Sequence, residues 1–207
     1  MALRLNGSSS GYVELEVPAD AGSHTLTLPD SGGSSGQVLS TNGSGTLSFA
    51  APGKILQVVS TTKTDTFSTT NTAYTDVTDL SVSITPASTS NKILIFGHID
   101  FGASADVLVV VQIVRGSTAI GIADAAGSRR QSSVGRYLGT ATTGSGTHVA
   151  VPFSHLDSPN TTSATTYKIQ ISSNAAGTLT VNRDSSDGDN GNIFRATSTI
   201  TAMEVAA

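Results

Sequence analysis

Residues 106–115 read DVLVVVQIVR and carry the clearest structural signal in the chain. Successive side chains of an extended strand point to opposite sides. One side of this strand would carry Val107, Val109, Val111 and Ile113, and the other would carry Leu108, Val110 and Val114. The run 92–101, KILIFGHIDF, is similar, because Leu94 and Phe96 would lie opposite Ile93, Ile95 and Ile99. Both stretches predict β-strands that are apolar on two faces.

In most other apolar runs the apolar residues alternate with polar ones, which predicts strands with one buried face and one solvent-exposed face. Gly, Pro, Asn and Ser clusters bound these runs, and no stretch shows a helical period of 3.6 residues. Strands are expected over residues 54–60, 73–77, 80–85, 92–101, 106–115, 119–124, 136–140, 148–155, 166–173, 178–183 and 193–205. Many short strands separated by turns predict an all-β fold. A jelly-roll-like β-sandwich is the first choice, and a fibronectin-like sandwich is the second.

The strands with two apolar faces predict association between copies of the chain. A two-layer sandwich buries only one face of each sheet, and no helix is expected that would cover the other. A neighbouring subunit is the natural cover, so the predicted subunit interface comprises Leu94, Phe96, Leu108, Val110 and Val114. The alternative is that a long loop of the same chain, such as residues 139–147, folds over the sheet.

The first fifty residues differ from the rest in composition, with shorter apolar runs and more Gly and Ser between them. Residues 24–49, HTLTLPDSGGSSGQVLSTNGSGTLSF, hold short apolar runs between Gly/Ser spacers, and Asn42–Gly43 predicts a tight hairpin between 37–41 and 46–50. An isolated hairpin is marginally stable in water, so this extended β-ribbon should need other chains. The predicted attachment and oligomerisation residues are Leu3, Leu5, Leu26, Leu28, Val38, Leu39, Leu47 and Phe49. The alternative is a flexible linker. The boundary is placed after Pro52, giving an attachment segment over 1–52 and a sandwich head over 53–207.

The same residues carry a family resemblance. The string LTLP, a Gly/Ser spacer and GQVLSTNGSGTLSF, followed by GKILQVVS, resembles the N-terminal part of fibre and appendage proteins of tailed bacteriophages, especially marine and cyanobacterial ones. The resemblance implies a structural virion protein, assembled in the host cytoplasm, with an attaching N-terminus and an all-β, usually trimeric, head displayed toward the host. Expected partners are sister chains, other virion proteins and a host-surface glycan or protein. The alternatives are a capsid or neck decoration protein without a receptor role, and a carbohydrate-binding module.

Composition excludes several other classes. The chain has 207 residues, a formal charge of −4 and only 13% charged residues, without the basic stripe of a nucleic-acid-binding protein. No apolar run approaches the roughly 20 residues of a membrane helix, so no membrane insertion is expected. Cysteine is absent, which removes disulfides, thiolate metal sites and a cysteine nucleophile.

Signals for enzymatic chemistry are weak, and neither an enzyme nor a cofactor is predicted. Residues 7–11 and 32–36 match G-x-S-x-G, but neither lies between a strand and a helix. The four histidines, His24, His98, His148 and His155, form no metal-binding pair, although His98 would share a strand face with Asp100, and His155 with Asp157. Phe96, Phe153, Tyr167 and Phe194 occupy strand positions and are expected in the core; Tyr12, Tyr74 and Tyr137 are candidates for exposure.

Residues 184–192, DSSDGDNGN, form the one acidic cluster. Asp187 and Asp189 have the spacing of Ca²⁺ ligands, but Gly191 stands where a third ligand belongs and no Glu follows. A solvated hairpin turn between flanking strands is therefore predicted in preference to a metal site. Together with residues 125–134 and 139–147, this loop is a candidate for host-surface contact, because loops on a rigid scaffold often carry recognition.

Overall fold

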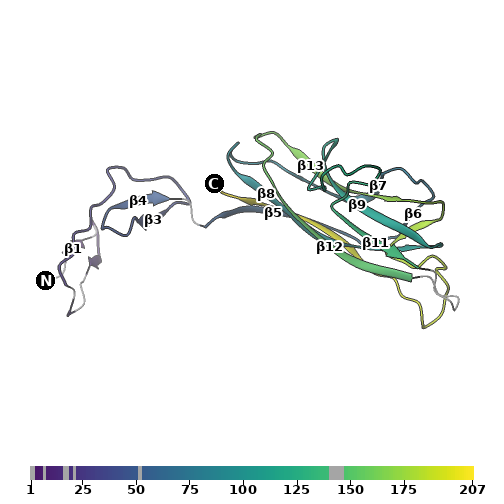
Figure 1. Ribbon diagram of the computed structural model, residues 1–207. Coiled ribbons are helices and arrows are strands. Elements are labelled where there is room, and N and C mark those ends of the chain that lie inside the picture. Colours follow the sequence, from purple (N-terminus) through teal and green to yellow (C-terminus); the bar gives the residue numbers. More distant parts are fainter. Residues whose placement is uncertain (1–2, 7, 16–18, 21, 51–52, 140–146) are drawn as a thin grey trace. The chain divides into compact units, whose positions relative to one another are not determined.

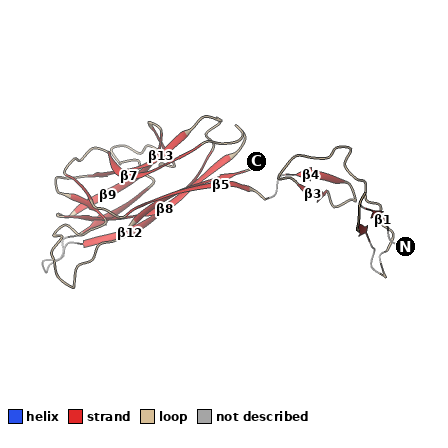
Figure 2. Cartoon of the chain, turned by 180° about the vertical axis from the view of Figure 1, so that it is seen from behind, coloured by secondary structure: helices blue, strands red, loops and turns tan. Residues whose placement is uncertain are grey.

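The computed structural model describes residues 3–6, 8–15, 19–20, 22–50, 53–139 and 147–207, and no helix occurs among them. The chain divides into two compact units, Met1–Gly53 and Lys54–Ala207 (Figures 1 and 2). The larger unit is called the head below, and the smaller one the N-terminal unit.

The head consists of antiparallel strands in two sheets (Figure 1). In chain order they are β5 (Ile55–Lys63), β6 (Phe67–Thr69), β7 (Thr75–Ile84), β8 (Lys92–Ala103), β9 (Val107–Arg115), β10 (Thr118–Ile120), β11 (Val134–Leu138), β12 (Thr147–Asp157), β13 (Thr165–Ser173), β14 (Leu179–Val181) and β15 (Ser198–Val205).

Their order is that of a jelly roll. Three pairs of strands lie end to end: β10 and β11 along β9, β14 and β15 along β8, and β5 and β6 along β15 and β14, respectively. If each pair is counted once, the eleven strands occupy eight positions. Numbered by these eight positions in chain order, one sheet has the order 1-8-3-6 (β5, β15, β8, β12) and the other has the order 2-7-4-5 (β7, β13, β9, β10 with β11). The predicted all-β, jelly-roll-like sandwich is confirmed.

The core lies between the two sheets and follows the period-two pattern of the sequence. Ile93, Ile95 and Ile99 of β8 are fully buried, as are Val107, Val109, Val111 and Ile113 of β9. Tyr167 is also fully buried, and its hydroxyl donates a hydrogen bond of 2.7 Å to Asp157, whose carboxylate also pairs with Arg115. Burial and this carboxylate both raise the pKa of the Tyr167 hydroxyl, which therefore stays protonated.

The second face of β9 is covered by the chain itself. Val110 and Val114 are only 3% and 2% exposed. Arg130, in the connection between β10 and β11, donates hydrogen bonds to Ser172 of β13, the ladder partner of Val110, and to the Thr72 carbonyl. This corrects the expectation that a neighbouring subunit covers these valines. The connection between β10 and β11 reaches this face through Arg130. Most of the loop considered from sequence, residues 140–146, lies outside the described residues.

Two other expectations need correction. The predicted strands 73–77 and 80–85 are one strand, β7, whose ladder shifts register between Lys168 and Gln170 of β13, near the positive φ of Asp79. The predicted hairpin turn across residues 184–192 is closed by a single antiparallel bridge between Arg183 and Arg195, and not by an extended ladder of paired strands. Strands β14 and β15 do not pair with each other; both pair with β8, one after the other along its length. Residues 182–197 connect them as a long loop that leaves the sheet and returns to it, and this loop is called the excursion.

The last strand is fixed by a buried carboxylate. Glu204 is 1% exposed and accepts hydrogen bonds from Gln57, from Asn91 and from the Ala87 backbone N–H. Burial raises the pKa of Glu204, but these three donors outweigh it, and the net shift is downward. The contacts join β15 to β5 and to the connection between β7 and β8.

This arrangement predicts an acid-sensitive head. The pKa of Glu204 is lower in the folded than in the unfolded chain. Its contribution to the free energy of unfolding is therefore complete at pH values above the ordinary pKa of 4.5, and it is lost as the pH falls through the pKa of the folded state. In urea unfolding near neutral pH and at about pH 3, the wild type should lose more stability on acidification than Glu204→Gln. An equal loss in both proteins would contradict the role given to this carboxylate.

The N-terminal unit contains two antiparallel strand pairs, β1 (Leu3–Asn6) with β2 (Tyr12–Leu15) and β3 (Val38–Thr41) with β4 (Leu47–Ala50). The predicted hairpin between residues 37–41 and 46–50 is confirmed as β3 and β4, with residues 42–46 as its loop. The Asn42 N–H bonds the Thr46 carbonyl, and φ is positive at Gly43 and Gly45 but not at Asn42. Thr27 forms an isolated parallel bridge with Thr46, which ties residues 26–28 to the hairpin.

Candidate functional site

The residues predicted to attach the chain mostly expose their side chains. Leu5, Leu26, Leu28, Val38 and Leu39 are exposed, whereas Leu47 and Phe49 are half-buried. Leu3 lies in β1, but its side chain is outside the described residues. Phe49 packs on Gly33, where a Cβ would come within 2.6 Å of its ring. Most of the apolar side chains described in this unit are therefore left uncovered.

The head also has an apolar row on the outward face of one sheet. Ladder register places four residues side by side across β5, β15, β8 and β12: Val58, Met203, Leu94 and Leu156. Val58 is 55% exposed and Leu156 is 51% exposed, while Leu94 and Met203 are half-buried. Phe96 follows Leu94 on the same face and is also half-buried. We call Val58, Met203, Leu94 and Leu156 the apolar row.

The surroundings of the apolar row contain little charge. The next ladder row comprises Ser60, Thr201, Phe96 and Ser154. Along residues 92–98 and their outward-facing ladder partners, all within the described part, Lys92 is the only Lys, Arg, Asp or Glu. Of the predicted interface residues, Leu94 and Phe96 therefore lie on a face that a partner can reach. Leu108, on the other sheet, is half-buried.

The excursion of residues 182–197 is anchored at its base by buried polar groups. Asn182 and Ser198 are fully buried, and the Ser198 hydroxyl donates a hydrogen bond of 2.6 Å to the Asn182 side chain. The Asn182 amide nitrogen in turn donates to the carbonyls of Lys63 and Asp65. Asp100 joins the cluster, because its N–H bonds Ser198 and its carbonyl accepts the Asn182 N–H. The excursion thus leaves the sheet from a fixed base.

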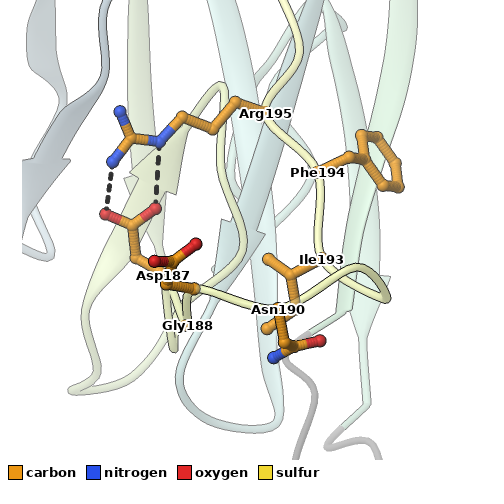
Figure 3. Close-up of a pocket in the computed structure, with 7 residues that line it drawn as sticks. Asp187, Gly188, Asn190, Ile193, Phe194 and Arg195 are labelled. Atoms are coloured by element: carbon orange, nitrogen blue, oxygen red, sulfur yellow. Dashed lines mark hydrogen bonds and ion pairs between the residues drawn. The ribbon is translucent and has the colours of Figure 1, made fainter.

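Within the excursion, further contacts hold the loop in one shape. Asp184 is buried and accepts hydrogen bonds from the Ser186 hydroxyl and the Asp187 N–H. Asp187 pairs with Arg195 through two bonds of 3.1 and 2.9 Å (Figure 3). The Arg195 guanidinium lowers the pKa of the Asp187 carboxyl, so Asp187 remains charged and paired.

An exposed aromatic ring borders this loop. Phe194 is 62% exposed, so the expectation that it belongs to the core is wrong. Its ring lies 4.2 Å from that of His148, centroid to centroid. His148 is itself held by a 2.7 Å contact to Asp100, a partner that sequence had assigned to His98. His98 instead bonds the Thr197 carbonyl and the Thr199 hydroxyl.

The loop borders an open cavity of about 270 Å³, lined by Asp187, Gly188, Asp189, Asn190, Ile193, Phe194 and Arg195 (Figure 3). Asp189 has no hydrogen-bond or ion-pair partner among the described residues, and neither does the side-chain nitrogen of Asn190. Sequence reasoning had found Asp187 and Asp189. It missed Ile193, Phe194 and Arg195, because the 193–205 run was assigned wholly to a strand.

A scan of protein-family models and a search of curated proteins find no match. Solved structures that match include the Gx strain of infectious bursal disease virus, 19% identical, with a TM-score of 0.34, covering 99% of this chain and 46% of that one. Particles with T=1 symmetry derived from the same virus are 17% identical, with a TM-score of 0.38, covering 98% and 44%. This chain spans less than half of those chains, and a likeness at these TM-scores does not bear on what it does.

Other candidate chemistry stays without structural support. Within the described ranges, no group of three or more His, Asp or Glu side chains is arranged to hold a metal ion. Gly32–Gly36 lies in a loop without a following helix, and the first G-x-S-x-G stretch includes Gly7, which is outside the described residues. Asp157, expected beside His155, bonds Arg115 and Tyr167. Among the described residues, no helix is long and apolar enough to span a membrane.

Proposed function

We propose that this chain is a non-enzymatic structural subunit of a virus particle, a short trimeric appendage of a tailed bacteriophage that contacts the host surface. The apolar row carries the proposal. The head already has a complete core between its sheets, yet Val58 and Leu156 remain more than half exposed at the two ends of a row that crosses four strands. A contiguous apolar strip of this kind marks a protein contact surface.

A second copy of the chain is the partner that this face favours. Among the described residues, the outward positions along residues 92–98 and their ladder partners carry His98 and otherwise Ser, Thr and apolar side chains, with Lys92 as the one Lys, Arg, Asp or Glu, so two or more copies can meet without large like-charge repulsion. Symmetric homo-oligomers use the same patch on every subunit. A threefold arrangement rests on the resemblance of the N-terminal string to phage appendage proteins.

The N-terminal unit supports attachment to a particle. Its exposed apolar residues, Leu5, Leu26, Leu28, Val38 and Leu39, sit on short strand pairs that are marginal alone. Packing against sister chains or another virion protein would remove these side chains from water. A decoration protein would use the same two surfaces but would lack a receptor site, and the cavity in the 182–197 excursion favours the appendage.

The oligomeric state of single-residue variants tests the proposal. We expect the wild type to sediment as a trimer and Val58→Asp to sediment as a smaller species, because each interface would bury an unpaired carboxylate. Thr62→Asp is the matched control, since Thr62 is also exposed on the outward face of β5 but lies two ladder rows from Val58. It should leave the trimer intact.

Two results would count against the proposed subunit. One is a wild type that is monomeric at micromolar concentration. The other is an equal response of Val58→Asp and Thr62→Asp, which would place the interface elsewhere. Circular dichroism of each variant separates a loss of association from a loss of folding.

A further inference from the structure

We propose that the cavity of the 182–197 excursion is a binding site for one neutral sugar unit. The proposal rests on the proposed function, in which the head meets a host surface, and it names the class of ligand and the residues that contact it.

The cavity offers an exposed hydrogen-bond acceptor and an exposed donor that no described residue of the chain engages. The Asp189 carboxylate has no partner in the described part of the chain, and the Asn190 side-chain oxygen, but not its nitrogen, is occupied by the Asn192 N–H. A carboxylate only accepts and an amide nitrogen only donates, whereas a hydroxyl does both. A ligand with adjacent hydroxyl groups can therefore satisfy the two residues at once.

The same cavity has an apolar border. Ile193 and Phe194 line it beside the polar groups, and the close-up shows their side chains on the other side of the loop from the Asp187–Arg195 pair (Figure 3). A pyranose ring has polar edges and apolar C–H faces, so it suits a site that combines free polar groups with apolar side chains. An exposed ring such as that of Phe194 usually costs ordering entropy on binding, but here His148 already holds it.

Charge argues against other small ligands. An anion such as phosphate would face the carboxylates of Asp187 and Asp189, and the nearby Arg195 is already neutralised by two bonds to Asp187. A hard cation prefers six or more oxygen ligands, whereas Asp189 is the only lining carboxylate not engaged in an ion pair. Of these three classes, a neutral polyhydroxyl compound suits the lining residues better than an anion or a hard cation.

The loop is also built to keep its shape without ligand. The Asn182–Ser198 bond fixes its base, Asp184 and the Asp187–Arg195 pair fix its first half, and His148 supports Phe194. A rigid site loses little conformational entropy when it binds. The geometry thus resembles a preformed site more than an unstructured turn.

Saturation-transfer NMR on the full chain tests the site, with the methyl glycosides of glucose, galactose, mannose and N-acetylglucosamine as probes at millimolar concentration. We expect at least one glycoside to receive saturation. Asp189→Ala and Phe194→Ala should each weaken its affinity by roughly tenfold. The matched controls are Asp124→Ala, an exposed aspartate of another loop, and Tyr137→Ala, whose ring is 61% exposed. Both controls should bind as the wild type does.

The proposal is overturned if no glycoside receives saturation, or if the cavity variants bind as well as their controls. Sedimentation of the same samples keeps this outcome separate from the proposed function. A trimer that ignores all four glycosides removes the sugar site alone, whereas a monomer that binds one removes the assembly and retains the site.

Discussion

Asn182→Ala should lower the free energy of unfolding of the head by about 4 kcal/mol, because several buried groups lose their partners at once. The Asn182 amide donates to the Lys63 and Asp65 carbonyls at 2.9 and 2.8 Å and accepts from the Ser198 hydroxyl. Each buried group left unsatisfied costs about 1–3 kcal/mol. Alanine at the left-handed φ of 63° adds about 1–2 kcal/mol. The melting temperature should fall by on the order of 10 °C.

Asn182→Gly separates the two causes. Glycine adopts positive φ freely but also lacks the amide, so it should lose about 1 kcal/mol less than alanine. Urea unfolding of both variants gives the comparison. If both variants stay within about 0.5 kcal/mol of the wild type, as surface substitutions do, the Asn182 amide does not stabilise the base of the excursion. A large loss for alanine alone would show that backbone strain is the whole effect.

The strand content of the head could be predicted because it is local. Period-two alternation located residues 92–101, 106–115 and 166–173, which became β8, β9 and β13 with shifts of a few residues at most. Strand β6, only three residues long, escaped notice because so short a run has no measurable period. The covering of Val110 was not predictable in the same way, since it depends on Arg130 reaching Ser172 across 42 positions of sequence.

The candidate surfaces were harder to predict, because they are made by register. Val58 and Leu156 are unremarkable in their own strands and become one strip only when the ladders align them with Met203 and Leu94. The cavity depends on the excursion, and the run 193–205 gave no sign that its first five residues leave the strand. The acidic residues of 184–192 could be identified from the sequence, but the ion pair in which Arg195 neutralises Asp187 could not.

Gly97→Ala should be the other severely destabilising substitution. Gly97 lies in the central strand β8, between β12 and β15. A Cβ at this position would overlap the Thr199 carbonyl oxygen of β15 and would come within 3.0 Å of the Phe153 ring of β12. The backbone of Thr199 cannot move aside as a flexible side chain can, so strands β8 and β15 must move apart at this point. Overpacking of this kind costs about 3 kcal/mol or more.

Thermal unfolding of Gly97→Ala and Gly191→Ala tests this cause directly. Gly191 has open space around its would-be Cβ and an ordinary φ, so its alanine variant should stay within about 0.5 kcal/mol of the wild type. The two substitutions add the same methyl group to the same unit, and only the first places it against backbone. Equal melting temperatures would show that β8 and β15 are not as close at Gly97 as the structure has them. A selective loss at Gly97 would also matter for assembly, because β8 and β15 carry Leu94 and Met203 at the centre of the apolar row.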